Sequence, residues 1–428
     1  MLVAPSSLMS VSLGASPCSL TGAVGEASAD GLLQALAKVP GPRDRRGVRY
    51  RLATLPAIGV CAMTAAGHNS LVAIAEWAQR CDQEVLARPG CPFDPFAGRY
   101  RAPGERTLRD AFAKGGPGAL TAAGFARFTA PASSAAGGLS PDGVPERAQR
   151  RAHRAAMPAP EPAQLRRRAF AVDGKCLRGA VRADGTRMFV LTAVRHDDAL
   201  TAALHEIGAK TNEIPEFAPL LDAIDDADLR EAVITVDAMH AQKEHARHLV
   251  EDRHAHYLLS VKNNQPTLAS QSRKLPWGKA PVLDRSRDRG HGREEVREVK
   301  VVFVDGLLFP HARQVVRIHR KRRPLGAKKW QSETGYAVTD LPTHQASPAE
   351  LASWARGHWI IENTVHWTKD VTFAEDASQV RRHYTPAVMS ALRDLTRTAL
   401  DRAGWTDIAS GRRAHTRPDA ALSLHGIP

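Results

Sequence analysis

The sequence lacks the features that mark secreted, disulfide-rich and membrane-embedded proteins. Its five cysteines are scattered singly, with no C-x-x-C pair, so neither a disulfide framework nor a zinc ribbon is indicated. No apolar run is long enough to span a bilayer, and the N-terminus lacks the basic segment and apolar core of a secretory signal. We therefore expect a cytoplasmic protein with no membrane partner and no small-molecule cofactor.

Acidic residues are fewer than basic residues. Lys and Arg total 59 against 45 Asp and Glu, which gives a formal net charge of +14 and a pI near 9.9. This balance favours a polyanionic partner through electrostatic steering and counterion release, and DNA is the first candidate. The alternative is a protein whose composition is simply biased toward Arg and Ala.

Shifts in composition divide the 428 residues into five segments. The pattern predicts a loose leader at 1–45, a helical module that could bind DNA at 46–115, an Ala/Gly/Pro/Arg-rich linker at 116–165, a catalytic domain at 166–405 and a tail at 406–428. Strand-like and helix-like periodicities alternate after the linker, so we expect an α/β fold with a mixed sheet and flanking helices.

Three β-like runs without intervening helices predict a β-rich insertion at about 266–340. Ser347 then begins a capping box with proline at the first helical position, which predicts a long helix running through Glu362. A last helix is expected at about 386–403.

Two short apolar strands each end in aspartate. AFAVDGK ends at Asp173 and AVITVDAMH at Asp237. An aspartate at a strand end is commonly a turn former or a helix cap. Two alike nevertheless favour a site, because ligands of open α/β sheets gather outside the carboxyl ends of strands, and carboxylates suit Mg²⁺.

The predicted long helix carries a polar stripe, His358, Glu362, His366 and Lys369, at spacings of four, four and three. Such a stripe indicates either a catalytic face turned toward the two aspartates or a solvated face held by intrahelical pairs. A zinc site is disfavoured because the H-E-x-x-H spacing is absent. Trp359 and Trp367 on this helix are core residues by the main interpretation and base-stacking residues by the alternative.

Polar and basic side chains near these acids could bind phosphate, although exposed lysines after a strand are usually only solvated. The candidates for DNA contact are Lys175, Arg178, Lys262, Gln265, Arg293, Arg356, His358 and Lys369.

Seven separated motifs together resemble those of bacterial insertion-sequence DDE transposases of the H-repeat-associated type. They are FAVDGKCLRGA, VITVDAMHAQKE, YLLSVKNNQP, HGREEVR, TGYAVTDL, RGHWIIENTVHWTKDVTFAEDAS and AVMSALRDLTRTAL. The similarity runs from about residue 166 to 403, and LVAIAEWAQ with ERTLRDAFAK resembles the N-terminal associated domain of that family.

The resemblance implies an RNase H-like fold interrupted by the β insertion. It also implies that Asp173, Asp237 and Glu362 form an acidic triad that holds two Mg²⁺ or Mn²⁺ ions for DNA cleavage and strand transfer. Glu362 and Lys369 match the E-x6-K half of the wider group's Y-x2-R-x3-E-x6-K signature, in which the lysine contacts DNA. A homodimer in the DNA complex is expected on the same ground.

The sequence departs from the family pattern without losing a carboxylate. In the signature, Ala355 stands where Tyr is usual and His358 where Arg is usual, while Arg356 lies two positions from the expected Arg. Cys176 and Asn263 replace a usual threonine and glycine. Two rival functions therefore remain, a decayed, inactive DNA-binding protein and a nuclease that cleaves DNA without joining it.

Overall fold

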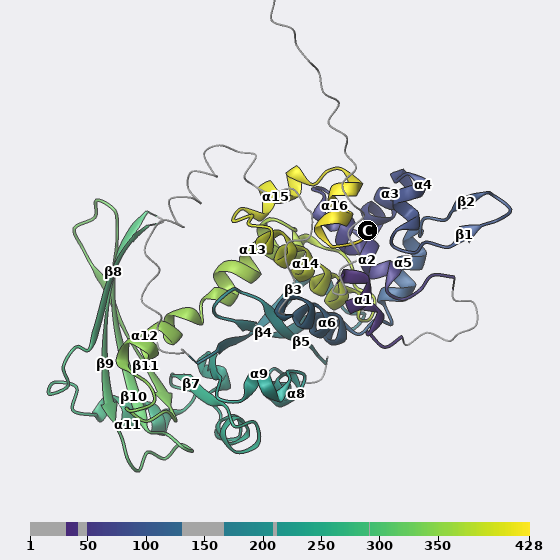
Figure 1. Cartoon of the computed structure of the whole chain (residues 1–428). Coiled ribbons are helices and arrows are strands. Elements are labelled where there is room, and N and C mark those ends of the chain that lie inside the picture. The colour runs from purple at the N-terminus through teal and green to yellow at the C-terminus, as the bar shows by residue number, and fades with distance from the viewer. Residues whose placement is uncertain (1–30, 42–48, 131–166, 209–211, 291) are drawn as a thin grey trace, which may run out of the picture.

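The computed structural model describes residues 31–41, 49–130, 167–208, 212–290 and 292–428. The mixed α/β architecture predicted from the sequence is confirmed: a large mixed sheet crosses the molecule and helices flank it (Figure 1). No helix among the described residues is both long and apolar enough to cross a membrane.

A nine-stranded sheet organises the fold, in the order β5-β4-β3-β6-β7-β11-β10-β9-β8. Its first half consists of β3 (Ala169–Val181), β4 (Arg187–Arg195), β5 (Thr201–Ile207), β6 (Val233–Val236) and β7 (His256–Val261). Strands β3, β4 and β5 are antiparallel neighbours, whereas β3, β6 and β7 run parallel. Parallel neighbours place their carboxyl ends at one edge, which brings the residues that follow them together.

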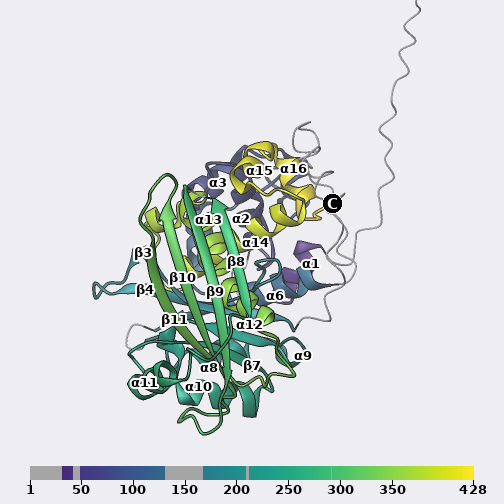
Figure 2. The ribbon, with the colours of Figure 1, turned by 90° about the vertical axis from the view of Figure 1, so that its left-hand side faces the viewer.

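The second half of the sheet is an antiparallel arm that projects from the body (Figures 1 and 2). Its strands are β8 (Asp284–Gly290), β9 (Arg293–Phe303), β10 (Gln314–Pro324) and β11 (Gln331–Thr339). The three predicted β-like runs correspond to β9, β10 and β11. A helix, α11 (Pro266–Lys274), and the edge strand β8 precede these runs in the same segment, and within residues 293–339 no helix lies between the three runs.

A set of small helices and one hairpin precedes the sheet. The elements are α1 (Leu32–Ala37), α2 (Thr54–Thr64), α3 (Leu71–Arg80), α4 (Gln83–Ala87), β1 (Phe93–Asp94), β2 (Arg99–Tyr100), α5 (Glu105–Phe112) and α6 (Pro117–Thr129). Helices α1 and α6 lie in segments expected to be a leader and a linker, and each buries apolar residues, among them Leu32 and Leu36 of α1 and Leu120 and Phe125 of α6. Both segments therefore contribute to the core, while residues 1–30 and 131–166 lie outside the described part.

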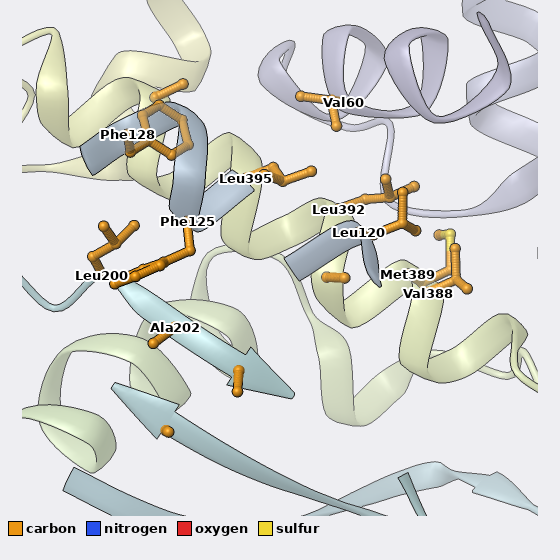
Figure 3. Packing of buried hydrophobic residues seen from close by; sticks show 14 of the residues in the cluster. Val60, Leu120, Phe125, Phe128, Leu200, Ala202, Val388, Met389, Leu392 and Leu395 are labelled. Carbon is orange, nitrogen blue, oxygen red and sulfur yellow. The ribbon is translucent and has the colours of Figure 1, made fainter. Parts of the chain in front are cut away.

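The long helix α14 (Thr385–Arg402) joins the N-terminal helices to the sheet. It packs between α2 and α6, and α6 in turn covers β5 (Figure 3). Glycines permit this approach: a Cβ at Gly59 would lie 2.8 Å from Leu392, and one at Gly124 would lie 2.2 Å from Leu395. The helical module and the sheet thus share one hydrophobic core.

The C-terminal segment is not the tail that the sequence suggested. It forms α15 (Ile408–Ala414) and α16 (Pro418–Leu424), and Leu422 and Ile427 are 1% exposed. Each of these helices is short and buries only a few side chains, so the sequence shows no helical periodicity long enough to predict them.

Short helical elements follow the strands. They are α8 (Phe217–Asp222), α9 (Asp226–Leu229), α10 (Lys243–Arg247) with a π-helical turn at His248–Asp252, α12 (Pro348–Gly357), a π-helix at Ile361–His366 and α13 (Trp367–Val371). The predicted capping box at Ser347 is present. The predicted long helix is interrupted after Gly357, however, and resumes as the π-helix that carries Glu362.

Candidate active site

The two aspartates lie side by side on parallel strands. Val172 of β3 pairs with Val236 of β6, so Asp173 and Asp237 are the next residues on each strand. Strand β6 ends there, as predicted, and Asp237 becomes the N-cap of a short 3-10 turn. Strand β3 does not end at Asp173, because it continues to Val181 by pairing with β4.

Glu362 reaches the same region from the helix that packs across β3. Ile361 and Val365 of the π-helix are fully buried against Ala171 and Val194 of the sheet. This packing fixes the helix and leaves Glu362 exposed beside the aspartates. The three acids are electrostatic neighbours, although in the described part of the chain no three His, Cys, Asp or Glu side chains form a ready-made set of metal ligands.

The charges of the three carboxylates affect one another. Burial raises the pKa of Asp173 to about 7, and the negative charges of Glu362, Glu213 and Asp237 contribute. Burial and the charge of Asp237 also raise the pKa of Glu362. Asp173 and Glu362 therefore both resist ionisation, and a cation between them would stabilise their charged forms.

Asp237 differs because a cation already contacts it. The Nζ of Lys262 donates to both carboxylate oxygens, at 3.0 and 3.3 Å. Burial would raise the pKa of Asp237, but the Ala238 backbone N–H and Lys262 outweigh it and lower the pKa. Asp173 instead contacts His366, 3.7 Å away, and burial lowers the pKa of that imidazole to about 3, so it carries no charge at neutral pH.

A groove between α12 and the sheet opens beside Asp237 and Glu362. Its floor is apolar, and basic side chains rim it. The floor includes Leu258, Val299, Ile318 and Ala337, and the rim includes Lys262, Arg297, Arg320 and Arg356. Burial lowers the pKa of Arg297; the nearby Glu295 opposes this effect, and repulsion from Arg356 and Arg320 adds to it.

Four of the predicted DNA-contacting cations lie on the surface. Arg178, Lys262, Arg293 and Arg356 are exposed, and each has a polar neighbour: Asp376, Asp237, Glu295 and Ser286, respectively. Exposed pairs of this kind contribute little to stability and are readily exchanged for phosphate contacts.

The structure contradicts the prediction of DNA contact for two lysines. Lys369 is fully buried; its Nζ donates to Ser390 at 2.9 Å and pairs with Asp394 at 2.7 Å. Lys175, 7% exposed, pairs with Asp370 at 2.6 Å and lies near Glu375. The spacing placed Lys369 on the stripe of Glu362, but the π-helical turn and the packing of α14 direct it into the protein.

His358 and Gln265 also differ from the surface contacts expected. His358 is 9% exposed, and its Nδ1 lies 3.2 Å from the hydroxyl of Thr235, so it forms part of the groove wall. Gln265 is half-buried and donates to Gln242. Trp359 and Trp367, expected mainly in the core, are 44% and 57% exposed.

Sequence reasoning missed Glu213. This residue lies before α8, far from the strand-end pattern that identified the aspartates, yet its carboxylate lies against Gly174 and its charge acts on Asp173. No spacing rule connects it to either aspartate, because the fold alone brings the segment after β5 to β3.

Comparison with known proteins defines the class. Residues 164–384 match the family described as "Transposase DDE domain", and residues 33–128 match the one described as "DDE_Tnp_1-associated". The first match covers more than half of the chain, and the chain belongs to the transposase DDE domain family.

Curated relatives agree with this assignment. The chain is 28% identical over 243 residues to "Putative transposase YncI" of Escherichia coli O157:H7, covering 53% of this chain and 60% of the relative. It is 26% identical over 238 residues to "H repeat-associated putative transposase YhhI" of Escherichia coli K12, covering 53% of this chain and 62% of the relative. The chain therefore matches less than two thirds of the length of these relatives.

Proposed function

We propose that the protein catalyses metal-dependent DNA cleavage and strand transfer at the ends of an insertion sequence. The observation that carries the proposal is the convergence of Asp173, Asp237 and Glu362 from two adjacent parallel strands and a helix, beside a groove rimmed with arginine. The strand order from β5 to β7 supports an RNase H-like fold, with the arm β8–β11 as its β insertion.

Asp173, Asp237 and Glu362 would hold two Mg²⁺ or Mn²⁺ ions. The donor set fits, because all three groups supply hard oxygen ligands and Lys262 already places a cation on Asp237. Bound Mg²⁺ supplies a Lewis acid that activates the attacking hydroxyl and stabilises the leaving oxygen of an in-line displacement. Lys262 would leave Asp237 as an ion arrives and turn its ammonium toward a DNA phosphate.

The reaction has two steps on DNA. Water attacks the phosphorus at the element's end, and the bond to the 3′ oxygen breaks to leave a free 3′-hydroxyl. That hydroxyl then attacks a phosphorus of target DNA, and a second phosphodiester bond breaks as the new one forms. The DNA backbone would be held by Lys262, Arg178, Arg293 and Arg356. The N-terminal helices would recognise the terminal repeats of the insertion sequence.

Two further expectations rest on the family resemblance. Because two element ends require two active sites, the DNA complex would contain a homodimer. We also expect the protein to act in the cytoplasm, where the nucleoid lies.

The decisive experiment compares nicking of a cloned element end by the wild type and by Asp237→Asn, with Mg²⁺ or Mn²⁺. Asp237→Asn should abolish nicking and retain DNA binding, whereas the control Asp252→Asn should match the wild type, because Asp252 is exposed and its ion pair is with His248 on the same helical turn. DNA binding without nicking by the wild type would indicate a non-catalytic protein. Nicking without joining would indicate a nuclease.

A further inference from the structure

The strands of the arm continue beyond the edge of the sheet at which β6 and β7 end. Tyr336 of β11 pairs with Val261, the last residue of β7, and residues 331–335 extend past it (Figure 2). Strand β10 pairs with β11 along this extension. Five residues of strand span about 17 Å. The tip of the arm, residues 319–330, therefore projects beyond the edge that carries the candidate active site.

The tip of the arm is strongly basic. Its sequence, HRKRRPLGAKKW, contains six Lys or Arg residues and no Asp or Glu. Arg320 and Arg323 form ion pairs with Glu333 at 3.0 Å and with Glu294 at 2.7 Å. The other four cations are exposed and have no ion-pair partner among the described residues: Lys321, Arg322, Lys328 and Lys329. Their charges are available to phosphate groups.

Contacts within the arm hold the backbone of the tip in place. The guanidinium of Arg323 lies over the ring of Trp330, 4.6 Å from its centroid. The backbone N–H of Leu325 donates to the Gly292 carbonyl at 2.8 Å, which joins the turn after β10 to the turn before β9. Gly326, with a φ of 82°, allows the chain to turn there. A backbone that is already ordered loses little entropy when the tip binds a partner.

The position of the tip separates it from the DNA expected at the element's end. The nine-stranded sheet has the arm at one end and β5, which α6 covers, at the other. Because the N-terminal helices are the proposed site of the terminal repeats, the element DNA would run from the three acids toward the end of the sheet at β5. A second duplex would then approach the acids from the side of the arm.

We propose that the tip of the arm binds the sugar-phosphate backbone of target DNA. Ammonium and guanidinium groups attract phosphates and release counterions whatever the base sequence is. The tip has no carboxylate or carboxamide side chain that could accept a hydrogen bond from a base, which suits a duplex of variable sequence. The inference rests on the proposed function, because target DNA is a substrate of strand transfer.

The test measures the joining of a pre-cut element end to a plasmid of arbitrary sequence. A tip variant with four cations replaced should need about 10-fold more plasmid for half-maximal joining but reach the wild-type maximum, and it should nick an uncut element end at the wild-type rate. Its substitutions are Lys321→Gln, Arg322→Gln, Lys328→Gln and Lys329→Gln. A charge-matched control removes four exposed cations outside the tip and should join as the wild type does. Its substitutions are Lys274→Gln, Lys279→Gln, Arg413→Gln and Arg417→Gln.

Binding supplies a readout that does not depend on the chemistry. Fluorescence anisotropy follows a labelled duplex of arbitrary sequence without divalent cations over a series of salt concentrations. The slope of log affinity against log salt concentration should be smaller by about 2 to 4 in the tip variant, since each phosphate contact contributes about 0.9. The double variant Lys328→Gln/Lys329→Gln should show about half of this change, and it decides if the fourfold variant does not fold.

Unchanged affinity of the tip variant for this duplex, or an equal loss in the control, would overturn the inference. Slower nicking of the uncut element end would assign the tip to the element DNA and would also overturn it. A wild type that binds the duplex but neither nicks nor joins would instead overturn the proposed function, and the binding comparison would still decide whether the tip contacts DNA.

Discussion

Asp173 is held in an environment that opposes its own charge. It is largely buried, carboxylates surround it, and the imidazole in contact with it is uncharged. The repulsion lowers the stability of the metal-free protein, and a bound cation would remove it. The same repulsion therefore raises the affinity of the site for a cation. The strand-end pattern could identify Asp173, but it could not predict the raised pKa of the carboxyl, because that pKa depends on burial and on charges from distant segments.

Asp173→Asn should stabilise the metal-free protein at high pH. The folded-state pKa of about 7 lies above the ordinary value of 3.8, so the group's contribution is fully present below pH 4 and is lost as pH rises through 7. The shift corresponds to about 4 kcal/mol at most. Thermal unfolding with a chelator should show a melting temperature several degrees above wild type at pH 8 and little difference at pH 4. A lower melting temperature at pH 8 would contradict this account.

At the scale of elements, a buried ionic network ties the helix of Glu362 to the rest of the protein. Lys369 of α13 pairs with Asp394 of α14, and Arg393 of α14 pairs with Glu375 at 3.1 Å. Lys175 joins β3 to the same cluster. Buried pairs of this kind are costly to break, because the remaining partner keeps its desolvated charge.

Lys369→Met should therefore destabilise the fold by about 3 to 5 kcal/mol, because it leaves Asp394 buried with one cation fewer. Lys321→Met, at an exposed position of β10, should change the free energy of unfolding by less than about 0.5 kcal/mol. Urea unfolding of both variants measures the difference. If Lys369→Met kept the wild-type stability but bound DNA more weakly, the result would support the DNA contact predicted from the sequence.

The elements that the sequence predicted are those whose signals are local. Short apolar runs predicted β3 and β6, and the capping box predicted the start of α12, because each signal depends on neighbouring residues. The π-helix at Glu362, the burial of Lys369 and the approach of Glu213 depend on contacts with distant segments. No spacing within the chain encodes these contacts.

At the scale of the whole molecule, the C-terminal segment joins the N-terminal helices to the end of α13. Arg412 donates through Nε to the Met63 carbonyl at 2.8 Å and through a terminal nitrogen to the Thr372 carbonyl at 2.7 Å. One guanidinium thus joins the end of α2 to the residue after α13. The segment boundaries drawn from composition did not predict this junction, because composition does not show which segments contact one another in the fold.

Arg412→Ala should lower the free energy of unfolding by about 3 kcal/mol or more, because buried carbonyl groups would lose their donor. Its neighbour Arg413 is 64% exposed, so Arg413→Ala should have an effect within about 0.5 kcal/mol. Equilibrium unfolding followed by circular dichroism compares the two. Equal effects of both substitutions would show that the C-terminal helices do not hold the two regions together.

The edge strand β8 restricts how two copies of the protein can meet. Its odd-numbered positions, 285, 287 and 289, are all arginine. Suppose that a two-fold axis perpendicular to the sheet paired β8 with β8 of a second copy as antiparallel strands. Residues directly opposite each other would then lie on the same face, so odd-numbered positions would face odd-numbered positions. Arginine would therefore face arginine wherever the two β8 strands overlap. The outermost strand thus protects the sheet from continuing into a neighbouring copy, and the homodimer proposed above would form through another surface.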